Sequence, residues 1–116
     1  MKKINILKNS RDFDRIIKNN RSYKYKDYIF YLQRNTDDVF KFGLSVGKKI
    51  GNPVRRNKVK RQLKAIISEK DYQNNFNCII IVGKGINKLS FDEMKKNLLI
   101  AFNNLNILKE NTDEKK

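Results

Sequence analysis

The residues best suited to chemistry in this sequence are basic, and they gather between positions 46 and 64. That segment contains no acidic residue, and no Asp or Glu occurs anywhere from position 39 to position 68. Its eight basic residues are Lys48, Lys49, Arg55, Arg56, Lys58, Lys60, Arg61 and Lys64. Arginine and lysine side chains bind phosphate groups, and the planar fork of arginine can hold two phosphate oxygens at once. The pattern therefore indicates binding of a polyanion.

The charge of the whole chain agrees with such a partner. The 116 residues carry a formal net charge of +15, which is far more than a small domain needs to stay in solution. Part of the lysine excess can reflect an A/T-rich genome. The arginines are more informative, because three of only seven lie within seven consecutive positions: Arg55, Arg56 and Arg61. Nucleic acid is the expected polyanion.

Residues suited to catalysis are scarce. The chain has no histidine and one cysteine, so it lacks an imidazole base and cannot build a cysteine zinc site. Asp12 and Asp14 would diverge on a helix, since positions two apart point in different directions. The acidic pairs 37–38 and 92–93 resemble a turn and a helix start. We expect no catalytic residue and no metal ligand in the protein itself.

A helix should carry most of the basic residues. Gly51 allows a tight turn, Asn52 is a good N-cap, and Pro53 suits the first helical position. On a helical wheel one face is apolar: Val59, Leu63, Ile66 and Ile67. The opposite face is polar or basic: Asn57, Arg61, Lys64 and Ser68. The first face must be buried, and the second must not be.

The N-terminal half predicts one helix and three strands. Asn9 or Ser10 can cap a helix from Arg11 to about Asn19, in which Phe13 belongs to an apolar stripe and is expected in the core. Strands are predicted at 22–25 and 28–33. The alternating segment 39–46 predicts a half-buried strand that forms a hairpin with its predecessor. Its polar face carries small residues, so another molecule could approach closely there.

The C-terminal half predicts a buried strand and a last helix. The run 78–82 does not alternate, so it indicates a strand buried on both faces, with Cys78 as a small core residue. Ser90 and Glu93 form a capping box for a helix whose buried face runs from Phe91 to Leu108. The chain thus predicts one α+β domain over residues 1–116, with a basic arm at 1–10 and a frayed tail at 111–116. With no apolar signal region or membrane-length run, the cytoplasm is the expected location.

RNA is a better fit than DNA. A helix-turn-helix needs a short helix just before the basic one, and a strand is predicted there instead. Contacts would be mainly to phosphates and sugars, and exposed aromatic residues could stack on unpaired bases. The available tyrosines are Tyr23, Tyr25, Tyr28 and Tyr31. A merely solvated basic face is the competing interpretation.

Residues 42–61 resemble the signature of the bacterial ribonuclease P protein component. They read Phe-Gly-Leu-Ser-Val-Gly-Lys-Lys-Ile-Gly-Asn-Pro-Val-Arg-Arg-Asn-Lys-Val-Lys-Arg. The family pattern is Val-Ser-Lys-Lys, Gly-Asn-Ala-Val, a basic residue, Arg-Asn-Arg and a Lys-Arg pair. Leu7-Lys8 with Arg11-Asp12-Phe13 also matches the family's opening, Tyr31 its first long strand, and residues 98–105 its last helix.

The resemblance implies a fold and a function. The fold is a two-layer α/β sandwich of αβββαβα order, with a small, mostly antiparallel four-stranded sheet and a left-handed strand–helix–strand crossover. The function is that of the protein subunit of ribonuclease P, one protein per RNA. It binds the catalytic RNA and the 5′ leader of precursor tRNA, while the RNA, with Mg²⁺, removes the leader. No membrane partner and no metal bound tightly by the protein are implied.

The resemblance also assigns residues. The family's basic motif corresponds to Lys48, Lys49, Asn52, Arg56, Asn57, Lys58, Lys60, Arg61 and Lys64, and Arg55 joins them as part of the same basic run. The leader cleft corresponds to Phe13, Ile17 and Tyr31, which revises the core interpretation of Phe13. Lys58 replaces an arginine, Ile17 stands where an aromatic residue is common, and Gly47 and Pro53 replace Ser and Ala.

Two other functions share some of these features. A small basic ribosomal or ribosome-associated RNA-binding protein would have the same composition, and it would sediment with ribosomal subunits. A stand-alone nuclease would cleave RNA without an RNA subunit and would be sensitive to a chelator.

Overall fold

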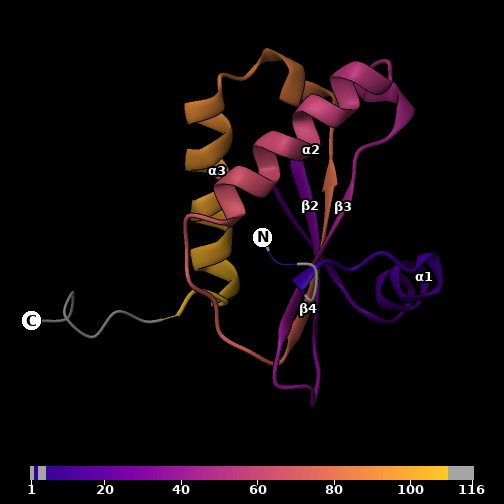
Figure 1. Cartoon of the computed structure of the whole chain (residues 1–116), viewed down its shortest axis with the longest axis vertical. Coiled ribbons are helices and arrows are strands. Elements are labelled where there is room, and N and C mark those ends of the chain that lie inside the picture. Colours follow the sequence, from indigo (N-terminus) through magenta and orange to yellow (C-terminus); the bar gives the residue numbers. More distant parts are fainter. Residues whose placement is uncertain (1, 3–4, 110–116) are drawn as a thin grey trace, which may run out of the picture.

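The computed structural model describes residue 2 and residues 5–109, in the element order shown in Figure 1. The helices and strands are α1 (Ser10–Asn19), β1 (Ser22–Tyr25), β2 (Tyr28–Arg34), β3 (Phe40–Ser45), α2 (Pro53–Ile67), β4 (Phe76–Val82) and α3 (Phe91–Leu105). Two short 3-10 helices, η2 (Lys48–Ile50) and η3 (Lys84–Lys88), flank α2 and β4. The α+β class and the αβββαβα order are confirmed. The predicted tail at 111–116 lies outside the described residues.

The four strands form one mixed sheet in the order β1-β2-β4-β3. β2 is antiparallel to both β1 and β4, whereas β3 is parallel to β4. The predicted hairpin between segment 28–33 and segment 39–46 is therefore wrong, because β4 lies between them. The physical reason is that β4 is apolar on both faces, which suits the interior of a sheet, where helices cover the faces and β2 and β3 pair with its two backbone edges. Parallel strands need a crossover connection, and α2 supplies it.

The two faces of the sheet are covered by different helices (Figure 1). On one face, Phe30, Phe42 and Ile80 belong to the main core together with the apolar side of α2 and with α3. On the other face, α1 packs through Ile16 in a smaller cluster with Ile79 and Leu7. Strand residues alternate between the faces, so neighbouring residues such as Ile79 and Ile80 serve different cores.

The N-terminal segment covers the free edge of β3. The Leu7 backbone N–H donates to the Phe42 carbonyl at 2.8 Å, and Asn5 Nδ2 donates to the Phe40 carbonyl at 2.7 Å. An uncovered edge would expose unpaired backbone groups. The segment therefore completes the sheet and leads directly into α1.

The predicted helix caps are present. Asn9 Oδ1 accepts from the Arg11 N–H at 2.8 Å, and Asn52 Oδ1 accepts from the Arg55 N–H at 2.9 Å. The capping box at the start of α3 is also formed. At its other end α3 stops earlier than predicted, because Asn106 adopts a left-handed conformation that breaks the helix. Leu108 consequently lies beyond the helix, where it forms an isolated bridge with Tyr72.

Candidate nucleic-acid interface

The basic helix has the two sides that its sequence predicts. Its apolar side is fully buried: Val59, Leu63, Ile66 and Ile67. Seven of the ten predicted RNA-binding residues are exposed on η2, at the helix cap or on the outer side of α2: Lys48, Lys49, Asn52, Asn57, Lys58, Arg61 and Lys64. The other three, Arg55, Arg56 and Lys60, are half-buried at the margins of the apolar stripe. We call these ten residues the basic surface.

No acid neutralises the basic surface within the described part of the chain. The ion pairs there are Arg15 with Asp12 at 3.0 Å and Lys95 with Glu69 at 2.5 Å, and neither uses a residue of the basic surface. The first turn of α2 also has no acidic residue, although the N-terminus of a helix carries a partial positive charge. The positive charges therefore repel one another, and a bound polyanion would relieve that repulsion.

A glycine turn sets the direction of α2. Gly51 has φ 151° and ψ −163°, a backbone region that only glycine adopts readily. A Cβ at this position would also lie 3.1 Å from Cβ and Cγ of Arg55. The turn between η2 and α2 thus requires glycine, and it lets the Arg55 side chain pack closely over the backbone.

Arg55 is held by a residue outside the basic surface. Its Nε donates to Asn87 Oδ1 at 2.7 Å, and Asn87 Nδ2 donates to the Ile50 carbonyl at 2.8 Å. Asn87 belongs to η3, thirty-two residues along the chain from Arg55. No sequence motif marks it, because the contact depends on how the chain after β4 returns beside the start of α2.

Arg56 lies deeper than a purely surface residue. Its Nε is buried and has no hydrogen-bond partner among residues 2 and 5–109, and the same is true of Gln62 Oε1. Burial without a partner costs free energy for a polar atom. Arg56 is therefore partly a residue of the protein interior, whereas Arg61 and Lys64 face solvent.

The three predicted leader-cleft residues meet on the α1 side of the sheet. Phe13, Ile17 and Tyr31 are all half-buried and pack around Ile16 and Ile79. The Phe13 ring lies directly on Gly43 of β3, since a Cβ there would stand 2.5 Å from Phe13 Cζ. The close approach expected at this strand is thus made by the protein's own ring. Phe13 is neither fully core nor freely exposed.

Only one of the four candidate tyrosines for base stacking lies on this side. Tyr28 is fully buried in the main core, where its hydroxyl donates to the Met94 carbonyl at 3.1 Å. Burial, with a smaller effect of the Asp27 carboxylate, raises the Tyr28 pKa above its ordinary value of 10.0. Tyr23 and Tyr25 pack against the main core on the α3 side. The stacking interpretation is wrong for Tyr28, because strand alternation turns it inward, and Tyr31 is the suitable candidate.

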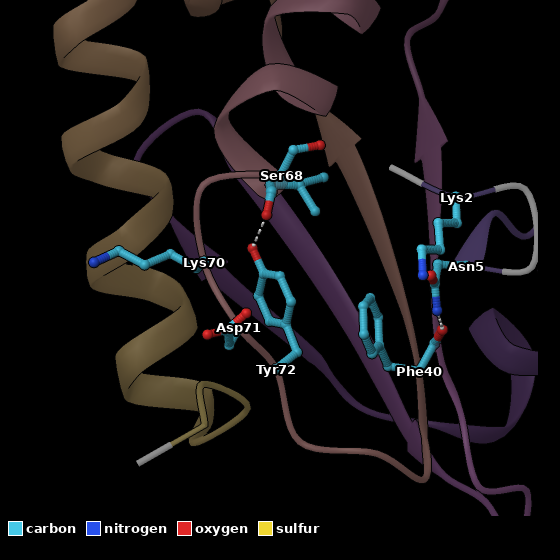
Figure 2. Close-up of a pocket in the computed structure, with 8 residues that line it drawn as sticks. Lys2, Asn5, Phe40, Ser68, Lys70, Asp71 and Tyr72 are labelled. Carbon is cyan, nitrogen blue, oxygen red and sulfur yellow. Dashed lines mark hydrogen bonds between the residues drawn. The ribbon is translucent and has the colours of Figure 1, made fainter. Parts of the chain in front are cut away.

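A cavity of about 540 Å³ lies elsewhere, at the C-terminal end of α2 (Figure 2). Its walls come from the N-terminal segment, the start of β3 and the connection after α2: Lys2, Asn5, Phe40, Ile67, Ser68, Lys70, Asp71 and Tyr72. Tyr72 closes one side, and its hydroxyl donates to the Ile67 carbonyl at 2.7 Å. No residue of the basic surface or of the predicted leader cleft lines this cavity.

Two kinds of feature are absent from the described part of the chain. Residues 2 and 5–109 contain no group of three or more His, Cys, Asp or Glu side chains arranged to hold a metal ion. Across the same residues, no helix has both the length and the apolar character needed to span a bilayer.

Similarity to known proteins points to one family. The family model described as Ribonuclease P matches residues 1–106. The ribonuclease P protein component of Lactococcus lactis subsp. lactis is 40% identical over 99 residues, covering 84% of this chain and 85% of that protein. The corresponding protein of Streptococcus pyogenes serotype M5 is 36% identical over 99 residues, with 84% and 83% covered.

Solved structures give the same result. The RNase P protein of Staphylococcus aureus superposes with a TM-score of 0.82 at 25% identity, covering 90% of this chain and 98% of that one. The RNase P protein of Thermotoga maritima superposes with a TM-score of 0.74 at 26% identity, covering 82% and 92%.

Proposed function

The chain belongs to the ribonuclease P protein family, and we propose that its basic surface binds ribonuclease P RNA while Phe13, Ile17 and Tyr31, between α1 and the sheet, bind the 5′ leader of precursor tRNA. As a protein component of ribonuclease P, the chain is a subunit of a ribonucleoprotein endoribonuclease and a partner of its RNA. The alternative of a ribosomal or ribosome-associated protein has no support from these relatives.

The observation that carries the RNA-binding proposal is the unpaired charge of the basic surface. Seven of its ten residues are exposed, and none forms an ion pair with an acid among the described residues. Lysine and arginine contacts to phosphates release counterions, so they contribute affinity without reading sequence. The protein would screen repulsion between the RNA subunit and its RNA substrate.

The leader proposal rests on the three half-buried residues between α1 and the sheet. Tyr31 and Phe13 are rigid aromatic groups already ordered by packing against Ile16, Ile79 and Gly43. Aromatic side chains stack on the bases of unpaired strands with little dependence on sequence, which suits leaders of varied sequence. Ile17 would add apolar contact in place of a stacking ring.

Mg²⁺ belongs to the RNA in this proposal. The basic surface repels divalent cations, and the described residues supply no clustered carboxylates that would attract one. The hydrolysis would be carried out by the RNA with its Mg²⁺, one protein would serve each RNA, and the protein would contribute no catalytic group.

The leader assignment is tested by comparing precursor tRNA with mature tRNA as ligands of the reconstituted holoenzyme. Tyr31→Leu keeps an apolar side chain but removes the ring, so affinity for the precursor should fall by roughly 5- to 100-fold if one base stacks there. Affinity for mature tRNA should not change. The matched control is Tyr23→Leu, another half-buried strand tyrosine, on the other face of the sheet. An equal loss for both ligands, or for both variants, would rule out the leader contact.

A further inference from the structure

We propose that Asn87 is a positioning residue for RNA binding, because it holds the Arg55 guanidinium ready for a phosphate group. The proposal rests on the proposed function of the basic surface and adds a residue from outside α2 to it. In Figure 1, the orange segment that follows β4 lies close to the start of α2. Asn87, in η3 after β4, accepts a hydrogen bond from Arg55, in the first turn of α2.

The Asn87 amide joins three segments through two hydrogen bonds. Its Oδ1 accepts from Arg55 Nε at 2.7 Å, and its Nδ2 donates to the Ile50 carbonyl at 2.8 Å. The amide orientation follows from these partners, since a flipped amide would set donor against donor and acceptor against acceptor. The end of η2, the first turn of α2 and η3 are thus connected at one side chain.

The hydrogen bond to Asn87 uses one of the five N–H donors of the Arg55 guanidinium and leaves the other four for another partner. A guanidinium has its remaining four donors on the two terminal nitrogens. No hydrogen bond or ion pair with residues 2 and 5–109 occupies those nitrogens. The donors that match a phosphate in a two-pronged contact therefore have no partner inside the described protein.

Arg55 is restrained at three points. Its backbone N–H is bound by the Asn52 cap at 2.9 Å, its Cβ and Cγ pack over Gly51, and its Nε is bound by Asn87. An unrestrained arginine loses rotamer freedom when it binds, and that loss weakens affinity. Ordering the side chain before binding removes part of this cost.

The arrangement also fixes Arg55 relative to its neighbours. Lys48 and Lys49 precede Ile50 in η2, so the bond from Asn87 to the Ile50 carbonyl ties their segment to the same amide. Asn87 itself is exposed, and its removal leaves no cavity in the core. A loss of RNA affinity on its replacement can therefore be separated from a loss of folding.

The test is a double-mutant cycle on affinity for ribonuclease P RNA. Asn87→Ala should weaken binding by roughly 3- to 10-fold, as expected for coupled neighbours. Arg55→Ala should weaken it at least as much, and Asn87→Ala should cost less affinity in the Arg55→Ala protein than it costs in the parent. As a control for additivity, Asn87→Ala combined with Lys64→Ala should multiply the two separate losses. Urea unfolding of each variant reports whether it is folded under the binding conditions.

The outcomes separate the two proposals. If the parent protein does not bind ribonuclease P RNA, the proposed function itself fails. If the parent binds and Arg55→Ala weakens binding, but Asn87→Ala does not, only the positioning role fails. That role also fails if Asn87→Ala causes an equal loss with and without Arg55, because the loss would then reflect general disturbance of the loops.

Discussion

At the scale of single residues, Gly43 is the position where one methyl group should matter most. A Cβ there would meet the Phe13 ring at 2.5 Å, a separation that forces the ring or the strand to move. Gly43→Ala should lower the free energy of unfolding by roughly 1–3 kcal/mol, as for other overpacked sites. Urea unfolding measures this directly.

Gly47 provides the matched control for that substitution. Its φ is −79°, and a Cβ added to it would meet no heavy atom within 4 Å. Gly47→Ala should therefore leave stability almost unchanged. If the two alanine variants unfold at the same urea concentration, the half-buried Phe13 ring moves off Gly43 without cost to the fold.

The buried tyrosine hydroxyls predict an alkaline loss of stability. Burial raises the pKa of Tyr28 and of Tyr72 above the ordinary value of 10.0. The unfolded chain then releases these protons at a lower pH than the folded protein. The contribution of the two hydroxyls to the free energy of unfolding is therefore fully present below pH 10.0 and falls as the pH rises above it. Tyr28→Phe should reduce the slope of unfolding free energy against pH in that range.

Tyr72→Phe is the second variant for the alkaline experiment, because the Tyr72 hydroxyl is also buried and donates to the Ile67 carbonyl. It should reduce the same slope, since burial raises the pKa of Tyr72 as well. Equal slopes for the parent and Tyr28→Phe proteins above pH 10.0 would mean that the Tyr28 hydroxyl ionises without cost to the fold.

The role of a single residue can be predicted from the sequence where that role is set by its neighbours in the chain. Asn52 caps α2 because an Asx side chain followed by proline favours a helix start. Such a prediction fails where the role depends on a contact with a distant segment. Alternation along β2 does not show which face meets α3, so the sequence leaves Tyr28 among the stacking candidates, and nothing near Asn87 indicates its contact with Arg55.

At the scale of elements, the outer side of α2 should determine the salt dependence of RNA binding. Arg61 and Lys64 are exposed on this helix and have no acidic partner among the described residues. Replacing each with alanine should lower the slope of log affinity against log salt concentration by about one unit per lost phosphate contact. Binding measured across a salt series reports the slope.

The control for the salt series is Lys96→Ala, which removes an exposed charge from α3. It should shift affinity slightly and leave the slope near that of the parent. If the Arg61→Ala and Lys64→Ala proteins show the same salt slope as the parent protein, these two residues do not contact RNA phosphates, whatever their effect on affinity.

Element boundaries are largely predictable from the sequence, whereas strand partners are not. Helix α2 follows from a cap, a proline and an apolar stripe, all within its own sequence. The partner of β3 is β4, more than thirty residues later, and burial of β4 on both faces is typical of a strand in the interior of a sheet. The non-alternating run at 78–82 carries that information, but the short turn at 35–38 favours the wrong hairpin.

At the scale of the whole molecule, the two proposed binding regions are connected by one small sheet. The basic surface lies on η2 and α2, which connect β3 to β4. The proposed leader site lies on the α1 side of the sheet, where Phe13, Ile17 and Tyr31 pack against residues of β4 and β3. β3 therefore contributes Gly43 beneath Phe13 and then leads directly into the basic turn. In the proposed arrangement, one rigid sheet sets the distance between the RNA subunit and the substrate leader.

The most direct test of the proposed function is the initial rate of precursor tRNA cleavage at low Mg²⁺, measured for ribonuclease P RNA with and without this protein. We predict that the RNA alone is slow, that the parent protein restores cleavage at the mature 5′ end, and that protein without RNA cleaves nothing. Absence of stimulation by the parent protein, or chelator-sensitive cleavage by RNA-free protein, would contradict the proposal.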